Sequence, residues 1–152
     1  MPLTFRKANF EDLPDIVRML ADDFLGQTRE RFEDPLPDSY VAAFCEIEGD
    51  KNNELIVAEI DGRLVGTLQL TFTPSISFQG GRRATVESVR VDEAYRGKGI
   101  GREIMLSAIR RAKERGCISM QLTTNVDRTD AHRFYERLGF NGSHVGMKIK
   151  LK

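Results

Sequence analysis

The sequence has few cysteines, no excess of charge of either sign and no long apolar run near its start. Cys45 and Cys117 stand alone, without a CxxC pair or closely spaced histidines. This argues against a disulfide framework or zinc site and predicts a reducing, cytoplasmic location. Lysine and arginine together number 23, and aspartate and glutamate together also number 23. The net charge is therefore zero, and no overall electrostatic field favours nucleic acid or a membrane as partner. The first residues, MPLTFRKANFEDLPDIV, resemble neither a signal peptide nor a membrane span.

No linker-like stretch divides the chain. The 152 residues contain no segment rich in proline, glycine and serine, no internal repeat and no low-complexity tract. A chain of this length has room for one substantial core. We therefore expect a single domain over residues 1–152.

The first half of the sequence predicts a strand, two helices and a hairpin. LTFRKA (3–8) favours a strand, and Asn9 can cap a helix whose apolar residues keep helical spacing: Leu13, Ile16, Val17, Leu20 and Phe24. SYVAAFCEIEG (39–49) favours a second, shorter helix. The run NELIVAEIDGRLVGTLQLTF (53–72) contains Asp61-Gly62 between two apolar stretches, a strong hairpin signal because both turn positions favour positive φ.

The second half alternates strands and helices. After a loop at 74–84, TVESVRV (85–91) favours a strand, and residues 101–116 carry an apolar stripe that predicts a helix: Ile104, Met105, Ala108, Ile109 and Ala112. CISMQLTT (117–124) favours a strand, RTDAHRFYERLG (128–139) a helix, and HVGMKIKLK (144–152) alternates as a last strand. The order β-α-α-β-β-β-α-β-α-β indicates an α/β fold with a mixed sheet covered by helices.

The strand at 85–91 has an irregular apolar pattern. Val86 and Val89 have opposite parity, so the apolar side chains change face between them. An inserted residue, which is a β-bulge, explains this pattern, and a strand buried on both faces explains it equally well.

Three glycines at alternate positions join this strand to the following helix. Residues 96–101 read RGKGIG and lead into the first turn of a helix, whose amides have no internal partner and attract anions. Glycines at 97, 99 and 101 remove the Cβ atoms that keep a phosphate away from those amides. Arg96 and Lys98 add positive charge. The segment therefore predicts a diphosphate site, although a plain glycine-rich turn has the same composition.

Two common phosphate motifs do not fit. GxxxxGK[ST] is absent, and GxGxxG fails because position 102 is arginine. Arg-x-x-Gly-x-Gly from Arg96 to Gly101, directly after a strand, resembles the acetyl-coenzyme A motif of the GNAT superfamily of N-acetyltransferases. AHRFYERLGF (131–140) is similar to the fourth-helix signature of that superfamily, and the order of elements matches along essentially the full chain.

The resemblance implies a fold and a branch within the family. The implied fold is a single-domain, mixed but mostly antiparallel sheet that is splayed at its centre and flanked by about four helices. LTTNVDRTDAHRFYERLGFNGSH (122–144) also resembles the aminoalkylphosphonate N-acetyltransferase branch.

The resemblance further implies which residues hold acetyl-coenzyme A. Val89 and Val91, with Arg90 between them, would hold the pantetheine arm, and the splay beside them would receive the thioester. The diphosphate would lie on the segment that comprises Arg96, Gly97, Lys98, Gly99, Ile100, Gly101 and Arg102. Many members have an asparagine seven positions before the helix tyrosine, where this chain has Arg128. We expect Asn125, three residues earlier, to contact the cosubstrate instead.

The resemblance also implies catalytic roles. Tyr135 would donate a proton to the leaving sulfur, although a core tyrosine beside Phe134 is the alternative. Glu87 would be the base, directly or through water, but it could equally face solvent or pair with Arg82 or Arg83. His132 is the other titratable candidate for the base. The expected oxyanion donor is the backbone amide near Val89.

The acceptor stays open. Six acidic residues against two arginines between residues 22 and 38 favour a cationic amine, whereas Arg82 and Arg83 favour a phosphonate. We expect transfer of acetyl to a primary amine of a small molecule or peptide N-terminus by direct attack in a ternary complex. We expect no metal, nucleic acid or membrane partner. The alternative is a non-catalytic acyl-coenzyme A-binding or sensing domain. A homodimer is compatible with these features.

Overall fold

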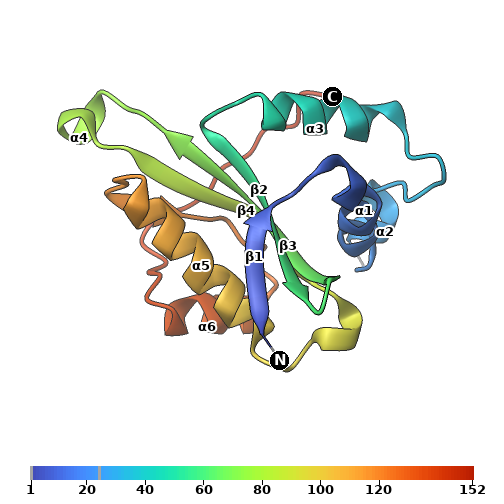
Figure 1. The fold of residues 1–152 in the computed structure, drawn as a ribbon. Coiled ribbons are helices and arrows are strands. Elements are labelled where there is room, and N and C mark those ends of the chain that lie inside the picture. The colour runs from blue at the N-terminus through green and yellow to red at the C-terminus, as the bar shows by residue number, and fades with distance from the viewer. Residues whose placement is uncertain (1, 24) are drawn as a thin grey trace.

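The computed structural model describes residues 2–23 and 25–152. In chain order (Figure 1), the elements are β1 (Leu3–Lys7), a 3-10 turn (Phe10–Asp12), α1 (Leu13–Ala21), α2 (Gly26–Arg29), α3 (Asp38–Glu48), β2 (Asn53–Ile60), β3 (Arg63–Thr73), α4 (Ser77–Gly80), β4 (Arg83–Val91), a second 3-10 turn (Glu93–Tyr95), α5 (Ile100–Glu114), β5 (Ser119–Gln121) and α6 (Thr129–Arg137). No described helix is both long and apolar enough to cross a membrane.

The five strands form one sheet in the order β1-β2-β3-β4-β5. β1, β2, β3 and β4 pair with one another in antiparallel fashion, and β5 pairs with β4 in parallel. The predicted hairpin is confirmed, because Ile60 pairs with Arg63 around Asp61 and Gly62. These two residues have φ angles of 50° and 77°, which an Asp-Gly pair adopts readily. The mixed, mostly antiparallel sheet therefore agrees with the expected fold.

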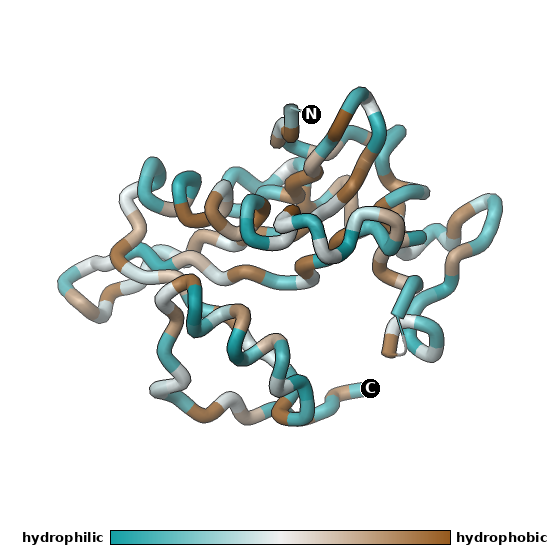
Figure 2. The backbone as a smooth tube through the Cα atoms, turned by 90° about the horizontal axis from the view of Figure 1, so that it is seen from below, coloured by the Kyte–Doolittle hydropathy of each residue, from teal (hydrophilic) through white to brown (hydrophobic). Residues whose placement is uncertain are grey.

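Helices cover both faces of the sheet. In Figure 1, α5 and α6 lie on one side of it and α1, α2 and α3 on the other. The main core is formed by β2, β3, β4 and α5, and it includes Val65, Leu70, Phe72 and Met105, all almost fully buried. Apolar segments recur along the sheet and its covering helices (Figure 2). Two smaller clusters lie under α1 and α3.

The irregular parity of β4 comes from a bulge. Gln69 pairs with Glu87, whereas Thr67 pairs with Arg90, so Ser88 and Val89 together face one residue of β3. Ser88 has a φ of 55°, which is uncommon for a residue with a Cβ. The bulge, one of the two explanations that the sequence allowed, is the one that the structure contains.

The sheet is splayed between β4 and β5. Pairing begins at Arg83 with Ser119 and ends at Thr85 with Gln121, so the two strands share no ladder beyond that point. The predicted strand at 117–124 is accordingly reduced to three residues. The bulge follows at once on β4, and the open part of the sheet therefore lies beside Ser88 and Val89.

Three boundary predictions need correction. α1 ends at Ala21, and the predicted position of Phe24 in that helix lies outside the described residues. The short helices α2 and α4 were not expected. The helices of nine or more residues in the described chain number four, which agrees with the expected number of about four. The predicted strand at 144–152 is wrong for the single chain. Residues 145–152 are exposed and form no ladder with a described strand. Alternating apolar and polar residues are typical of a strand, but a strand forms only where a neighbouring strand supplies its hydrogen bonds.

Candidate functional site

A buried aspartate anchors the loop between β4 and α5. Oδ1 of Asp92 accepts the backbone N–H of Ala94 at 2.9 Å, and Oδ2 accepts from Nη2 of Arg18 at 2.9 Å. Burial acts to raise the pKa of Asp92, but these bonds outweigh it and hold the pKa below its usual value. Asp92 thus ties the start of the glycine loop to α1.

The glycine loop leaves the N-terminus of α5 open. Gly97 and Gly99 have φ angles of 77° and 79°, which glycine adopts without strain. A Cβ at either position would meet nothing within 4 Å, so the space beside the loop is free. The first amides of α5, those of Ile100, Gly101 and Arg102, precede the first helical hydrogen bond, which runs from Glu103 N–H to the Gly99 carbonyl at 3.2 Å. This geometry suits a diphosphate.

The third glycine has a different role from the one expected. A Cβ at Gly101 would lie 3.6 Å from Cζ of Phe134 and 3.7 Å from Cγ2 of Val91. A side chain at position 101 would therefore face α6 and the end of β4 and make ordinary van der Waals contact there, away from the open space of the loop. Of the three alternate glycines, Gly97 and Gly99 provide the turn conformations with positive φ.

The cations of the loop contact the protein itself. Arg96 donates from Nε to the Val91 carbonyl and from Nη2 to the Asp22 carbonyl, both at 3.3 Å. Nζ of Lys98 lies 5.3 Å from the centre of the Tyr95 ring, a cation–π contact. Arg96 thus links the loop to the segment after α1, and Lys98 stays at the surface.

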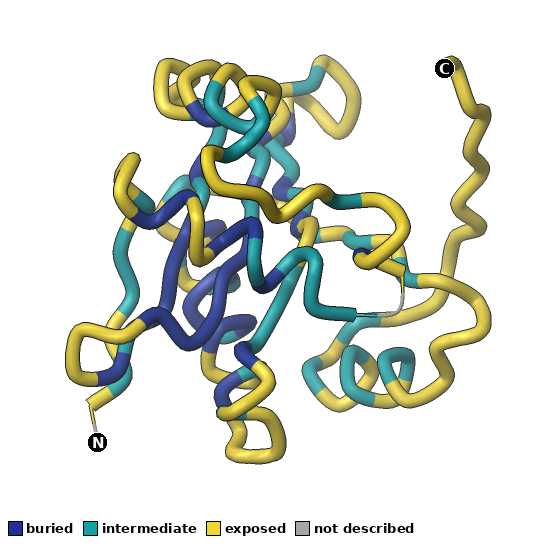
Figure 3. The backbone as a smooth tube through the Cα atoms, turned by 90° about the vertical axis from the view of Figure 1, so that its right-hand side faces the viewer, coloured by how far each residue is buried: buried dark blue, intermediate teal, exposed yellow. Residues whose placement is uncertain are grey.

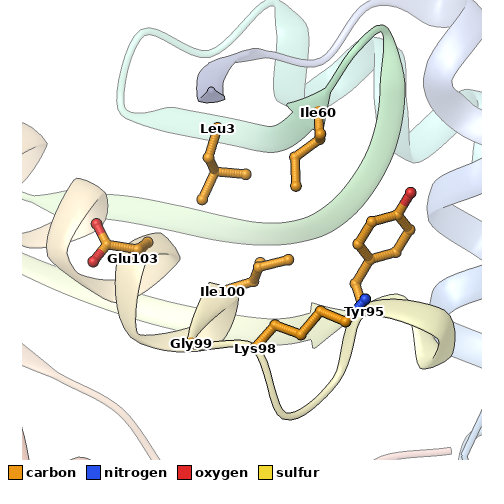
Figure 4. Close-up of a pocket in the computed structure, with 7 residues that line it drawn as sticks. All are labelled: Leu3, Ile60, Tyr95, Lys98, Gly99, Ile100 and Glu103. Carbon is orange, nitrogen blue, oxygen red and sulfur yellow. The ribbon is translucent and has the colours of Figure 1, made fainter. Parts of the chain in front are cut away.

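A shallow pocket of about 350 Å³ lies beside the loop (Figure 4). Its lining combines apolar, aromatic and charged residues: Leu3, Ile60, Tyr95, Lys98, Gly99, Ile100 and Glu103. It lies between β1, the hairpin and the start of α5. Because none of its lining residues belongs to β4, β5 or α6, it is separate from the splay.

The bulge opens the backbone of β4 at the splay. Two residues facing one on β3 leave part of the β4 backbone outside the ladder. Nη1 of Arg90 donates to the Val89 carbonyl at 2.9 Å. Val89 and Val91 are half-buried and pack against the main core. The predicted pantetheine contacts on β4 therefore lie together, directly after the point where β4 and β5 separate.

Tyr135 combines a packed ring with an electropositive surrounding. Its ring makes edge contacts with Phe134 and Phe140 at centroid distances of 5.1 and 5.9 Å. Burial raises the pKa of Tyr135, and the nearby charges of Arg90 and Arg128 oppose this rise without cancelling it. The phenol therefore stays protonated at neutral pH, as a proton donor must.

An ion cluster that sequence reasoning missed lies near Tyr135. Oδ2 of Asp23 lies 3.4 Å from Nε of Arg90 and 3.6 Å from Nη2 of Arg128. Nε of Arg90 is buried and has no hydrogen-bond partner among the described residues. Burial lowers the pKa of Arg90, and Asp23 acts in the opposite direction. Sequence analysis identified Asp23 only as one member of an acidic segment, because its partners lie 67 and 105 positions away.

The other candidates lie in two places. Glu87 is exposed on β4 opposite Gln69. Arg82 donates to Oδ1 of Asn52 at 2.9 Å, at the paired end of β4 and away from the splay. At α6, Nε2 of His132 lies 3.0 Å from the carbonyl oxygen of Asn125, which precedes the helix. Oδ1 of Asn125 accepts from the N–H of Asp127 at 2.9 Å. Among the described residues, no group of histidine, cysteine and acidic side chains could hold a metal ion.

A splayed mixed sheet with a glycine loop at the start of its central helix defines a class of acyl-transfer folds. The model of the Acetyltransferase (GNAT) family matches residues 15–140, and the chain belongs to this family.

Two named relatives and one solved structure locate the chain within the family. A crystal structure of a transcriptional regulator from Bacillus halodurans C-125 is 57% identical, with a TM-score of 0.95 over 99% of this chain and 100% of that one. Glucosamine 6-phosphate N-acetyltransferase of Trypanosoma brucei brucei is 30% identical over 59% of either chain. Aminoalkylphosphonate N-acetyltransferase of Salmonella typhimurium is 43% identical over 39% of this chain and 38% of that protein. The alignments thus span about three fifths or less of these two curated relatives.

Proposed function

We propose that this protein transfers acetyl from acetyl-coenzyme A to a primary amine by direct attack in a ternary complex. The observation that carries the proposal is that the bulged strand β4, the start of α5 and the Tyr135 helix meet: a Cβ at Gly101 would contact both Val91 of β4 and Phe134 of α6, and the charge of Arg90, beside the bulge, acts on the Tyr135 phenol. Acetyl-coenzyme A supplies an activated thioester. The open space beside Gly97 and Gly99 fits its diphosphate, and the free backbone of β4 fits its amide-containing arm.

Different residues would carry out the separate proton transfers of the reaction. The amine has to lose a proton before its nitrogen bonds to the carbonyl carbon, and Glu87 or a water held by it would accept that proton. A backbone N–H released by the bulge near Val89 would donate to the oxygen as it gains charge. Tyr135 would give its proton to the sulfur as the carbon–sulfur bond breaks, and the raised pKa of Tyr135 keeps that proton in place beforehand.

The structure alters the balance between the two acceptor classes. Of the acidic residues between α1 and α3, Asp23 is paired with Arg90 and Arg128, Glu30 with Arg29, and Glu33 with Arg31. Three of the six acidic residues between positions 22 and 38 are therefore paired with arginine. Near Tyr135, two guanidiniums share the single carboxylate of Asp23. This surplus of positive charge favours an amine that also carries an anionic group, such as an aminophosphonate or amino sugar phosphate.

The alternative is an acyl-coenzyme A-binding or sensing domain without turnover. The name of the Bacillus halodurans relative, transcriptional regulator, is compatible with it. The position of Tyr135 favours the enzyme, because a domain that only binds has no need of a proton donor at the sulfur.

The test is an acetyl-transfer screen, read as release of free thiol, over polyamines, amino acids, N-terminal peptides, aminophosphonates and amino sugar phosphates. We expect turnover with at least one anionic amine and a lower kcat/KM for polyamines. Binding of acetyl-coenzyme A without thiol release from any class would favour the sensing domain. Turnover with polyamines alone would overturn the anionic acceptor but keep the enzyme.

A further inference from the structure

Two arginines from distant parts of the chain converge on the carboxylate of Asp23. Arg90 lies on β4, and Arg128 directly precedes α6. The side chains of Asp23 and Arg90 are 15% and 16% exposed, whereas that of Arg128 is 46% exposed. Figure 3 shows α6 as a helix of half-buried and exposed residues. The cluster therefore has a buried side at Arg90 and an accessible side at Arg128.

The charges around this carboxylate do not balance. The charged groups that act on one another here are three arginines, Arg29, Arg90 and Arg128, and two acids, Asp23 and Glu30. Nε of Arg29 pairs with Oε2 of Glu30 at 2.8 Å, which leaves Asp23 opposite two guanidiniums. Among these five groups, one positive charge has no counter-charge.

Arg90 also has unused hydrogen-bonding capacity. Its Nη1 donates to the carbonyl of Val89 at 2.9 Å, but its Nε is buried and donates to no described group. A guanidinium carries five N–H donors, and a buried donor without an acceptor costs stability. Phosphate and phosphonate groups suit such a site, because their oxygens accept from two guanidinium nitrogens at once.

The register of the sheet places Arg90 on the same face as Glu87. Glu87 pairs with Gln69 and Arg90 pairs with Thr67, and residues two apart on a strand point to the same side. Two residues of β3 span about 7 Å. An amine whose nitrogen lies at Glu87 would therefore have its anionic group at Arg90 if a few bonds separate the two.

We propose that Arg90 and Arg128 form the subsite for the anionic group of the acceptor, and that Asp23 is their counter-ion in the free protein. The acceptor is then a small primary amine that carries a phosphate or phosphonate group a few bonds from its nitrogen. This assignment rests on the acetyl transfer proposed above. It goes further because it assigns the choice of acceptor to two side chains.

The kinetic test compares matched amines with the parent and with Arg128→Gln. The pairs are glucosamine 6-phosphate with glucosamine, and aminoethylphosphonate with ethylamine, read as release of free thiol. The parent should have a lower KM for the anionic member of at least one pair. Arg128→Gln should raise that KM by about 10-fold or more. Its kcat, its affinity for acetyl-coenzyme A and its KM for the neutral member should stay close to the parental values.

The variant should fold, because the N–H and the carbonyl of Arg128 make the local hydrogen bonds, to Asn125 at 3.0 Å and from His132 at 3.1 Å. Arg128→Lys keeps the charge and should recover part of the lost affinity. Arg133→Gln is the matched control, because Arg133 is an exposed arginine of α6 that pairs with Asp130, and it should keep the parental KM.

Three kinetic results would overturn the subsite. They are a parental preference for the neutral member of both pairs, an unchanged KM for the anionic member in Arg128→Gln, and a loss in that variant of affinity for acetyl-coenzyme A rather than for the acceptor. In each case, turnover by the parent shows separately that the acetyl transfer itself stands.

A second measurement does not require turnover. With coenzyme A bound, an NMR titration of the parent with aminoethylphosphonate should shift the Nε–H signals of Arg90 and Arg128 but not that of Arg133. Ethylamine at the same concentrations should shift none of them. These shifts without thiol release from any amine would support the subsite and contradict the acetyl transfer. Turnover of aminoethylphosphonate without these shifts would contradict the subsite alone.

Discussion

Nε of Arg90, on the strand that carries the bulge, lies 3.4 Å from Oδ2 of Asp23, just after α1. The pair connects the segment expected to face the acceptor with the strand expected to hold the thioester arm. Arg128, just before α6, reaches the same carboxylate at 3.6 Å. One aspartate therefore joins three parts of the chain that meet at the splay.

Removing the charge of Asp23 should loosen this junction. Asp23→Asn leaves two guanidiniums without their shared counter-ion, and we expect a loss of about 2 kcal/mol in the free energy of unfolding. Urea denaturation at neutral pH measures it. The control is Asp22→Asn, because the contact of Asp22 with Arg96 uses its backbone carbonyl. Equal stability of the two variants would show that the ion cluster contributes nothing.

Gly99→Val should weaken binding of acetyl-coenzyme A by about 10-fold or more, since a branched side chain would occupy the open space beside the loop. Its positive φ adds strain of about 1–2 kcal/mol. Gly116→Val is a matched control, because Gly116 has a φ of 73° and a Cβ there also meets nothing within 4 Å. Calorimetry should find the affinity reduced only in Gly99→Val. Parental affinity in a folded Gly99→Val would remove the diphosphate assignment.

Glu87→Gln should lower turnover at neutral pH by about 10²-fold while affinity for acetyl-coenzyme A stays within a few-fold. Raising the pH should restore part of the rate, because more of the amine is then already neutral. Glu114→Gln, at the exposed far end of α5, is the control and should keep the parental rate. A pH–rate profile that matches the parent would make Glu87 a bystander.

Tyr135→Phe separates the enzyme from the binding domain. It keeps the edge contacts with Phe134 and Phe140 and removes one hydroxyl, so the melting temperature should change little. The phenol acts mainly as the carbon–sulfur bond breaks, and we therefore expect turnover to fall by about 10²-fold with affinity for acetyl-coenzyme A nearly unchanged. Acetylation of the best amine at the parental rate would instead assign Tyr135 to the core.

The ion pair of Arg6 and Asp12 should make the free energy of unfolding depend on pH. Burial acts to raise the pKa of Asp12, but the hydrogen bonds from Arg6 and from the Asn9 N–H outweigh it and lower the pKa. The folded form then holds the proton less tightly than the unfolded form, whose pKa is about 3.9. This stabilisation is present above that pH and is lost as the pH falls below it.

Asp12→Asn should therefore be less stable than the parent at pH 7, and the difference should shrink as the pH approaches 3. Denaturant titrations at both pH values measure it. A constant difference between the two pH values would show that ionisation of Asp12 does not contribute.

The sequence by itself determined the features that depend on neighbouring residues. Asp61-Gly62 specified the hairpin because both residues tolerate positive φ, and the spacing of the apolar residues after Gly101 specified α5. The glycines at 97 and 99 likewise encoded an open loop before that helix, because their conformations are local.

The tertiary structure decided what depends on distant residues. Parity at Val86 and Val89 left two explanations, and only the register against β3 selects the bulge. Asp23 meets Arg90 and Arg128 because α1, β4 and α6 converge, which no local pattern encodes. Alternation at 144–152 predicted a strand that the described chain does not form, because a strand needs a neighbouring strand to supply its hydrogen bonds and no local pattern encodes that neighbour.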